Sequence, residues 1–226
     1  MSNQIREGKI TAIIPVRAGS QRVKNKSIKS FGDTNLLEHK IKQLLEIKEI
    51  DEIILTTDSK IAKDIGNKYN IKVLDRDNYY ASSECNNSEF FKYIAEQTDK
   101  SNNFLLYTPV TSPFVKNETL QNVIKIFLEN TEYDSVVPVE TLKHHMWMNN
   151  KPLNYSLENA PNTQDLPDIF ALNYTCSIIS REDQIKLSSL CGLKPYFYKL
   201  SQLEAIDIDT IYDFEMAQIL YKNKFN

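Results

Sequence analysis

The interpretation of this chain starts from one stretch, Ile10-Thr11-Ala12-Ile13-Ile14-Pro15-Val16-Arg17-Ala18-Gly19-Ser20-Gln21-Arg22-Val23-Lys24-Asn25-Lys26. Its first half is an apolar run suited to a buried strand. Its second half is a loop rich in cations, and the next acid along the chain is Asp33. Ligands of open α/β sheets bind beyond the carboxyl ends of the strands. Backbone N–H groups beside Gly19 and Ser20, with these cations, suit a polyphosphate. The alternative is a solvated basic loop that binds no ligand.

The composition makes this basic loop a local feature. The chain has 226 residues and a formal net charge of -3, with 25% charged and 41% hydrophobic residues. These values are typical of one globular α/β domain and argue against a general nucleic-acid binder. No apolar leader and no run of membrane-spanning length is present. Three widely spaced cysteines match no zinc or redox motif, which favours reduced thiols in a cytoplasmic protein.

Short apolar runs alternate with amphipathic segments along most of the chain. Strands are predicted at 9–16, 52–57, 71–74, 103–107, 135–139, 174–180 and 195–200, and helices at 36–47, 59–69, 88–97, 118–129, from 181, and up to about 221. This alternation predicts an α/β fold with a Rossmann-like, mostly parallel sheet and helices on both faces. We therefore expect a single domain over residues 1–226.

The alternation stops between about residues 140 and 170. The segment contains His144, His145, Trp147 and several prolines, and it is too long for a plain loop in a compact domain. We interpret it as an insertion that leaves the sheet, forms a small lobe and returns. The adjacent histidines have no further ligands nearby in the sequence, so we interpret them as polar or interface residues.

Two carboxylates near the C-terminus are the second signal. In Asp207-Ile208-Asp209, residues two apart on a strand would point to the same face, while Ile208 points into the core. Hard oxygen ligands on one face suit Mg2+ together with phosphate oxygens. The structural alternative is a helix start, because Thr210 and Asp213 have the spacing of a capping box. No P-loop motif and no Gly-x-Gly-x-x-Gly occurs, so phosphate binding would rest mainly on side-chain cations.

Together these motifs resemble the CMP-sialic acid synthetases and the related CMP-Kdo synthetases. The pattern Arg-x-Gly-Ser-x-Arg-x-x-x-Lys matches the family's triphosphate-binding loop, and Asp207-Ile208-Asp209 is similar to its metal-binding Asp-x-Asp. The resemblance implies nucleotide contacts at Arg17, Ala18, Gly19, Ser20, Arg22, Lys26, Asp58, Arg76 and Ser88. It implies Mg2+ as the cofactor, on Asp207 and Asp209, and catalytic roles for Arg17, Lys26, Asp207 and Asp209.

The acceptor side of the resemblance is less regular. Thr111, Ser112, Gln164 and Asn173 match positions that the resemblance assigns to substrate binding. Pro109 stands where the family has a Gln associated with the sugar acid, Thr163 replaces an Arg, and Tyr174 follows Asn173 where Gly is usual. These departures leave the identity of the acceptor open.

The resemblance implies a CTP-dependent cytidylyltransferase that joins CMP to a sialic, pseudaminic or legionaminic type of sugar acid and releases pyrophosphate. Kdo or a non-sugar acid is an alternative acceptor, and a nucleotide-binding protein without catalysis is an alternative function. CTP and a small acidic acceptor are the expected partners, with no nucleic acid and no membrane. We further expect a cytoplasmic homodimer, with the insertion at about 140–170 as the dimer contact.

Overall fold

The computed structural model describes residues 5–19 and 23–225 of the chain. Its main sheet has eight strands within these residues, in the order β10-β7-β11-β6-β1-β4-β5, with β12 paired to β7. The strands are β1 Ile10–Val16, β4 Glu52–Thr57, β5 Lys72–Asp75, β6 Phe104–Tyr107, β7 Ser135–Leu142, β10 Ile169–Leu172, β11 Ser177–Ser180 and β12 Pro195–Lys199. β1 pairs in parallel with β4 and β6, β4 with β5, and β12 with β7. Among these eight strands only β10 and β11 run antiparallel to their neighbours. The sheet is therefore mostly parallel, as expected.

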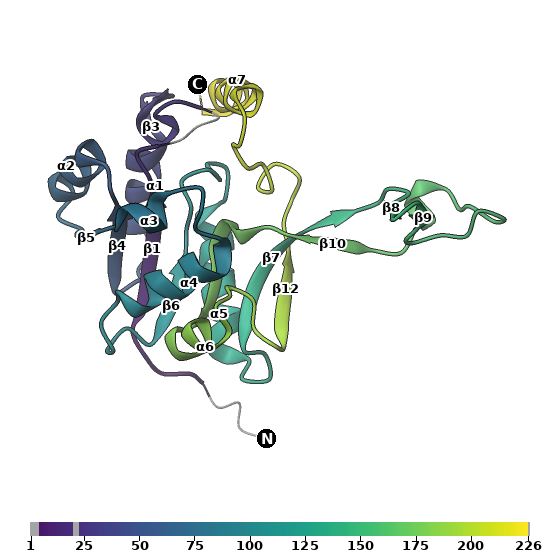
Figure 1. Ribbon diagram of the computed structural model, residues 1–226, viewed down its shortest axis with the longest axis horizontal. Helices are drawn as coiled ribbons and strands as arrows, with labels where there is room; N and C mark the ends of the chain where they lie inside the picture. The colour runs from purple at the N-terminus through teal and green to yellow at the C-terminus, as the bar shows by residue number, and fades with distance from the viewer. Residues whose placement is uncertain (1–4, 20–22, 226) are drawn as a thin grey trace.

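Helices cover both faces of this sheet (Figure 1). They are α1 Leu36–Leu45, α2 Lys60–Lys68, α3 Asn78–Ala81, α4 Asn87–Glu96, α5 Asn117–Glu129, α6 Arg181–Leu187 and α7 Ile211–Phe225. Three short 3-10 turns, η1 Lys26–Ile28, η2 Thr163–Asp165 and η3 Tyr174–Cys176, and two small hairpins, β2 Ser30–Phe31 with β3 Thr34–Asn35 and β8 Trp147–Met148 with β9 Lys151–Pro152, complete the fold. The expected Rossmann-like architecture is therefore present.

The core divides into two clusters because successive strand residues point to opposite faces. On β1, Ile13 packs in the cluster that contains residues of α4, whereas Ala12 and Ile14 pack in the larger cluster that contains residues of α1, α5 and α7. Both faces of the central strand are thus buried. A nearly continuous apolar sequence, here broken only by Thr11, is the pattern expected for a strand covered on two sides.

The order of the strands places a switch point at β1. The chain passes from β1 to β4 and β5 on one side, and then returns to β6 on the other side of β1. The loops after β1 and β6 therefore leave the same edge of the sheet in opposite directions. In open α/β sheets this arrangement opens a crevice at the carboxyl ends of the strands.

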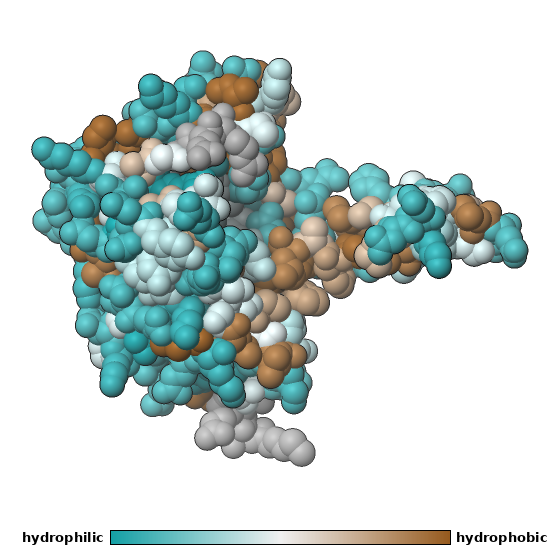
Figure 2. Space-filling model, viewed as in Figure 1, coloured by the Kyte–Doolittle hydropathy of each residue, from teal (hydrophilic) through white to brown (hydrophobic). Residues whose placement is uncertain are grey.

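Residues 143–168 form an arm that extends away from the sheet (Figure 1). β7 leads into the arm and β10 returns from it, pairing Leu172 with Val139. At the base of the arm, Asp168 lies 2.8 Å from Lys143 Nζ and 2.9 Å from Lys199 Nζ. Hydrogen bonds from these two lysines lower the pKa of Asp168 to about 2. Figure 2 shows hydrophobic residues along this arm.

Within the described residues no helix is both long and apolar enough to cross a lipid bilayer. All three cysteines carry free thiols, as expected, although only Cys176 is fully buried.

Candidate active site

A cleft of about 520 Å3 opens at the carboxyl ends of β1 and β6. Its walls come from the basic loop, the segment before α4, the loop after β6 and the C-terminal segment. The lining residues are Pro15, Arg17, Lys26, Ser27, Arg76, Tyr80, Ser82, Cys85, Asn87, Phe90, Tyr107, Pro109, Val110, Thr111 and Asp209. This is the crevice that the topology predicts, and we call it the first cleft.

The basic loop contributes two of the cations expected from the sequence. Arg17 is exposed at the end of β1, and its Nη1 lies 3.5 Å from the Ala81 carbonyl oxygen. Lys26 begins the turn η1 and is half-buried. Gly19 is exposed, and a Cβ added there would meet open space. Ser20 and Arg22 lie outside the described residues.

Asp58 holds the backbone of this loop. Its Oδ1 accepts the N–H of Ala18 at 2.7 Å. Both residues line a smaller pocket of about 280 Å3 behind the loop rather than the first cleft. The structure therefore shows Asp58 positioning the loop.

Arg76 forms the opposite wall of the first cleft. Its Nη2 donates to the Thr56 carbonyl at 2.8 Å, and its guanidinium carbon lies 4.6 Å from the centre of the Phe90 ring. Desolvation lowers the pKa of Arg76 to about 10, which leaves it charged at neutral pH. Its buried Nε has no hydrogen-bond partner among the described protein groups. A buried cation with an unused donor, facing a cleft, is suited to bind an anionic ligand.

The Asp207–Asp209 segment has no regular secondary structure and is not a strand, which corrects the expectation from its sequence. No neighbouring strand pairs with it. The segment is held through Ile208, whose side chain is fully buried. The N–H of Ile208 donates to the Thr111 carbonyl at 2.8 Å, and the carbonyl of Ile208 accepts a hydrogen bond from Lys26 Nζ. Lys26 Nζ also lies 3.7 Å from Asp209 Oδ1. Lys26 therefore ties the basic loop to the C-terminal segment.

The contacts at the start of α7 show which residues cap this helix. Asp213 Oδ2 accepts the N–H groups of Thr210 and Asp209, at 2.7 and 3.1 Å, and Thr210 Oγ1 accepts the N–H of Asp213 at 3.2 Å. The capping box exists, and Thr210 and Asp213 form it. The carboxylates of Asp207 and Asp209 lie at the walls of clefts instead.

A second cleft of about 350 Å3 adjoins the first. It is lined by Asn87, Phe91, Tyr107, Pro109, Thr111, Ser112, Glu140, Leu172, Asn173, Tyr174, Thr175, Ala205 and Asp207. Asn87, Tyr107, Pro109 and Thr111 line both clefts, so these four residues form the boundary. Asp209 lines the first cleft and Asp207 the second. The two carboxylates therefore lie on either side of the boundary.

The electrostatics at this boundary suit a divalent cation. Desolvation raises the pKa of Asp207, and the nearby charge of Asp209 raises it further, while a hydrogen bond from Thr111 opposes both. Two neighbouring carboxylates that repel each other gain from a shared cation. Hard oxygen donors of this kind are the ligands Mg2+ prefers, with phosphate oxygens completing the set.

Besides Asp58 and Ala18, Ser88 and Gln164 are expected site residues that line neither cleft. Ser88 is exposed on α4 and lines neither cleft, whereas its neighbour Asn87 lines both. Gln164 is exposed in the arm, remote from both clefts in this single chain. Asn173, Thr111 and Ser112 do line the second cleft. The sequence did not identify Tyr107 and Asn87 as site residues, because they reach the boundary only when β6 and α4 come together in the folded chain.

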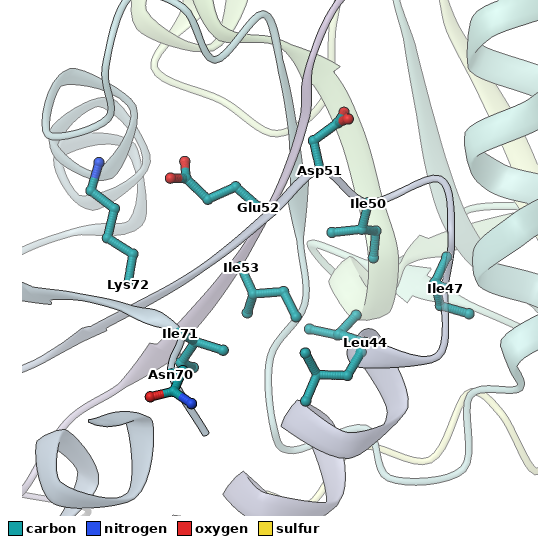
Figure 3. Close-up of a pocket in the computed structure, with 10 residues that line it drawn as sticks. Leu44, Ile47, Ile50, Asp51, Glu52, Ile53, Asn70, Ile71 and Lys72 are labelled. Carbon is teal, nitrogen blue, oxygen red and sulfur yellow. The ribbon is translucent and has the colours of Figure 1, made fainter. Parts of the chain in front are cut away.

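The other large pocket lies at the opposite edge of the sheet. It measures about 530 Å3 and is formed by residues at the end of α1 and the starts of β4 and β5, including Ile47, Ile53 and Ile71 (Figure 3). Only Asp51, Glu52 and Lys72 among its lining residues are charged. Because ligands of open α/β sheets bind at the carboxyl edge, this pocket is separate from the candidate active site.

Comparison with known proteins agrees with this geometry. A family model described as Cytidylyltransferase matches residues 11–224. The chain belongs to the cytidylyltransferase family. Membership of this family supports the expectation of an enzyme of the nucleotidyltransferase class.

Individual members of the family cover the chain to different extents. An N-acylneuraminate cytidylyltransferase of Escherichia coli O18:K1:H7 is 26% identical over 96% of this chain and 53% of its own length. A CMP-N,N'-diacetyllegionaminic acid synthase of Legionella pneumophila is 28% identical over 94% of this chain and 96% of its own length. The chain thus spans about half of the first relative and nearly all of the second.

Solved structures of other proteins share the fold. A 4-diphosphocytidyl-2C-methyl-D-erythritol synthase from Anaerococcus prevotii superposes with a TM-score of 0.71, at 18% identity and over 95% of this chain and 96% of that chain. A CMP:2-keto-3-deoxy-manno-octonic acid synthetase complexed with CTP gives a TM-score of 0.70, at 11% identity and over 96% of this chain and 100% of that chain.

Proposed function

We propose that the protein transfers CMP from CTP to a hydroxyl group of a sugar acid of the sialic, legionaminic or Kdo type. One observation carries this proposal: Asp209 and Asp207 lie on two adjoining clefts that share one wall. Transfer between two bound substrates needs two sites and a reacting phosphorus between them. The names of the relatives supply the nucleotide and the acceptor class.

In this proposal the triphosphate of CTP occupies the first cleft, against Arg17, Lys26 and Arg76. The acceptor occupies the second cleft, beside Thr111 and Asn173. An acceptor hydroxyl oxygen attacks the α-phosphorus and forms the new P–O bond, while the bond between that phosphorus and the bridging oxygen breaks. The bridging oxygen leaves with the pyrophosphate, and the hydroxyl proton passes to solvent.

The chain's own residues contribute position and charge rather than covalent chemistry. The cations of the first cleft bind the triphosphate and stabilise the negative charge that moves onto the leaving pyrophosphate. Asp207 and Asp209 would hold Mg2+, which neutralises phosphate charge and lowers the pKa of a hydroxyl bound to it. Tyr107 separates the clefts, and burial raises its pKa, so it remains a neutral phenol.

The chemistry of the second cleft bears on the acceptor. Its acidic lining residues are Glu140 and Asp207, and no Lys, Arg or His is present among the described residues that line it. A carboxylate on the acceptor would therefore need a cation from outside this lining. In this proposal that cation is either the metal at the two aspartates or a side chain of the second chain in a dimer.

Assembly as a homodimer through residues 140–170 is part of the proposal. The arm exposes Trp147, Met148, Leu153 and Leu157, each by half or more of its surface. Monomeric proteins rarely expose so many large apolar side chains on one projecting segment. A two-fold contact between arms would bury them. Gln164 would then belong to an interface. A cytoplasmic location, where CTP is available, completes the proposal.

The deciding experiment measures pyrophosphate release from CTP by the purified protein. The acceptor panel is N-acetylneuraminate, N,N'-diacetyllegionaminate and Kdo, each with and without Mg2+, and ATP, GTP and UTP replace CTP as controls. We expect Mg2+-dependent release with CTP and one member of the panel. CTP binding without release with any acceptor would instead support a nucleotide-binding protein.

A further inference from the structure

Lys40 is a buried cation inside an otherwise apolar helix face. On α1 the other buried residues are Leu36, Leu37, Ile41 and Leu44, and Lys40 is as fully buried as they are. No carboxylate among the described residues lies within 4.0 Å of its Nζ. Burial lowers the pKa of Lys40 to about 8. Removing an ammonium group from water without a counter-ion costs stability, and a methionine would fill the same space without that cost.

Lys40 donates a hydrogen bond to the loop that follows β6. Its Nζ donates to the Ser112 carbonyl at 3.1 Å and to Gln43 Oε1 at 2.8 Å. Two neighbours on α1 hold the same loop: His39 Nε2 donates to the Pro113 carbonyl at 3.0 Å, and Gln43 Nε2 donates to the Val115 carbonyl at 2.6 Å. One face of α1 therefore binds three carbonyls of this loop.

The other side of the same loop faces the second cleft. Ser112 Oγ accepts Thr175 Oγ1 at 2.9 Å, and Asn173 Oδ1 accepts the N–H of Thr175 at 3.2 Å. Asn173 Nδ2 in turn donates to the carbonyl of Ala205 at 2.8 Å, two residues before Asp207. A chain of hydrogen-bonded residues thus runs from Lys40 along the wall of the second cleft to Ala205, just before Asp207.

We propose that Lys40 is a positioning residue of the acceptor site: by holding the Ser112 carbonyl it fixes the loop whose hydroxyls line the second cleft. It touches neither substrate. Its effect reaches the acceptor through Ser112 and Thr175, and it reaches Asp207 through Asn173 and Ala205. The cations of the first cleft, Arg17, Lys26 and Arg76, come from the loop after β1, from η1 and from the segment after β5, and they make none of the hydrogen bonds in this chain.

The test compares Lys40→Met with Lys42→Met, the same change at an exposed lysine of the same helix. A hydrogen bond from a charged donor contributes roughly 1.5–3 kcal/mol, so a roughly tenfold to hundredfold loss is the expected scale. We expect Lys40→Met to lower kcat/KM for the best panel acceptor by that factor, with the dissociation constant of CTP unchanged within about twofold. Lys42→Met should behave as the wild type.

A second measurement does not depend on turnover. The N–H of Ile208 donates to the Thr111 carbonyl, so its hydrogen exchange reports on the loop. We expect faster exchange at Ile208 in Lys40→Met and unchanged exchange at Ile14 in β1. If no panel acceptor reacts, the proposed function fails while this measurement still decides the role of Lys40. If Lys40→Met does not fold, Lys40→Leu, which also removes the donor, takes its place.

Two results would overturn the inference. One is wild-type acceptor kinetics together with wild-type exchange at Ile208. The other is an equal loss of CTP and acceptor binding, because that pattern would show a general structural role.

Discussion

The N–H of Ile208 donates to the carbonyl of Thr111 at 2.8 Å, and this bond joins the C-terminal segment to the loop after β6. It fixes Ile208 in the core and leaves Asp207 and Asp209 on either side of it. Because Thr111 lines both clefts, the same bond places the carboxylates at the boundary between them. The position of the acids is therefore set by the contacts of Ile208 with Thr111 and Lys26 rather than by a strand.

Replacing Arg17 should weaken nucleotide binding without unfolding the protein. Arg17 is exposed and lines the first cleft, so Arg17→Ala removes a cation and little packing. Loss of a charge-assisted phosphate contact predicts roughly tenfold to hundredfold weaker CTP binding, measured by calorimetry. Lys24→Ala, an exposed cation of the same loop outside the cleft lining, is the control. Equal affinity in both variants would remove Arg17 from the nucleotide site.

The two aspartates should matter more for turnover than for CTP binding. Asp207→Asn and Asp209→Asn keep the shape of each side chain but weaken the donor set for Mg2+. We expect both to lose most Mg2+-dependent pyrophosphate release and to keep much of the CTP affinity, which rests on the cations. Glu215→Gln on α7 is the matched control. Near-normal rates in both aspartate variants would exclude a metal site here.

Asp207 should also lower stability in the absence of metal. Desolvation raises the pKa of Asp207, because the folded state disfavours the charged carboxylate. The protonated carboxyl group favours the folded state, and this contribution to stability is lost as the pH rises through the raised pKa. Asp207→Asn should therefore have a higher Tm than the wild type at pH 7 in divalent-free buffer. The difference should shrink as the pH falls below that pKa. A variant less stable than the wild type at pH 7 would contradict this reasoning.

Lys40 gives a pH dependence of the opposite sign. Its pKa of about 8 in the folded protein lies below the value of 10.5 for a free lysine side chain. The unfolded chain binds the extra proton between these values, so the free energy of unfolding should rise with pH above about 8. The titratable groups near Lys40 are Cys176 of η3, whose pKa burial raises to about 12, and His39 on α1.

The measurement is chemical unfolding from pH 7 to pH 9.5, with the wild type compared to Lys40→Met. Contributions from Cys176 largely cancel in this difference. We expect Lys40→Met to be the more stable variant at pH 7 and the advantage to decrease as the pH rises. A difference that does not change with pH would mean that Lys40 is not desolvated in solution.

Charged substitutions on the arm should prevent dimer formation. Met148 and Leu157 are 58% and 64% exposed, so Met148→Asp and Leu157→Asp leave the core intact. Light scattering should show a dimer for the wild type at micromolar concentration and a monomer for the double variant. Leu193→Asp, at a residue 79% exposed on the body, should remain dimeric. A wild-type monomer would refute the assembly.

The sequence alone determined most strands of the sheet and its binding edge, although it missed β10 and began the strand of β11 three residues too early. β4 begins and ends at the predicted residues, Glu52 and Thr57, because hydrophobic periodicity and helix caps are local signals. The cationic loop was also predicted at the end of the first strand, and the strand order makes that position a switch point of the sheet. A buried apolar strand followed by clustered cations needs no long-range information to be recognised, and Lys26 and Arg17 do line the first cleft.

Only the tertiary structure decided how the site is divided. Asp207 and Asp209 read as one face of a strand, yet contacts with Thr111 and Lys26 hold them on two clefts. Lys40 interrupts the apolar stripe of α1, and its partner Ser112 lies 72 residues away in the chain. Periodicity describes neighbours along the chain. The partners of a buried charge are brought together by packing between distant segments, which no local pattern contains.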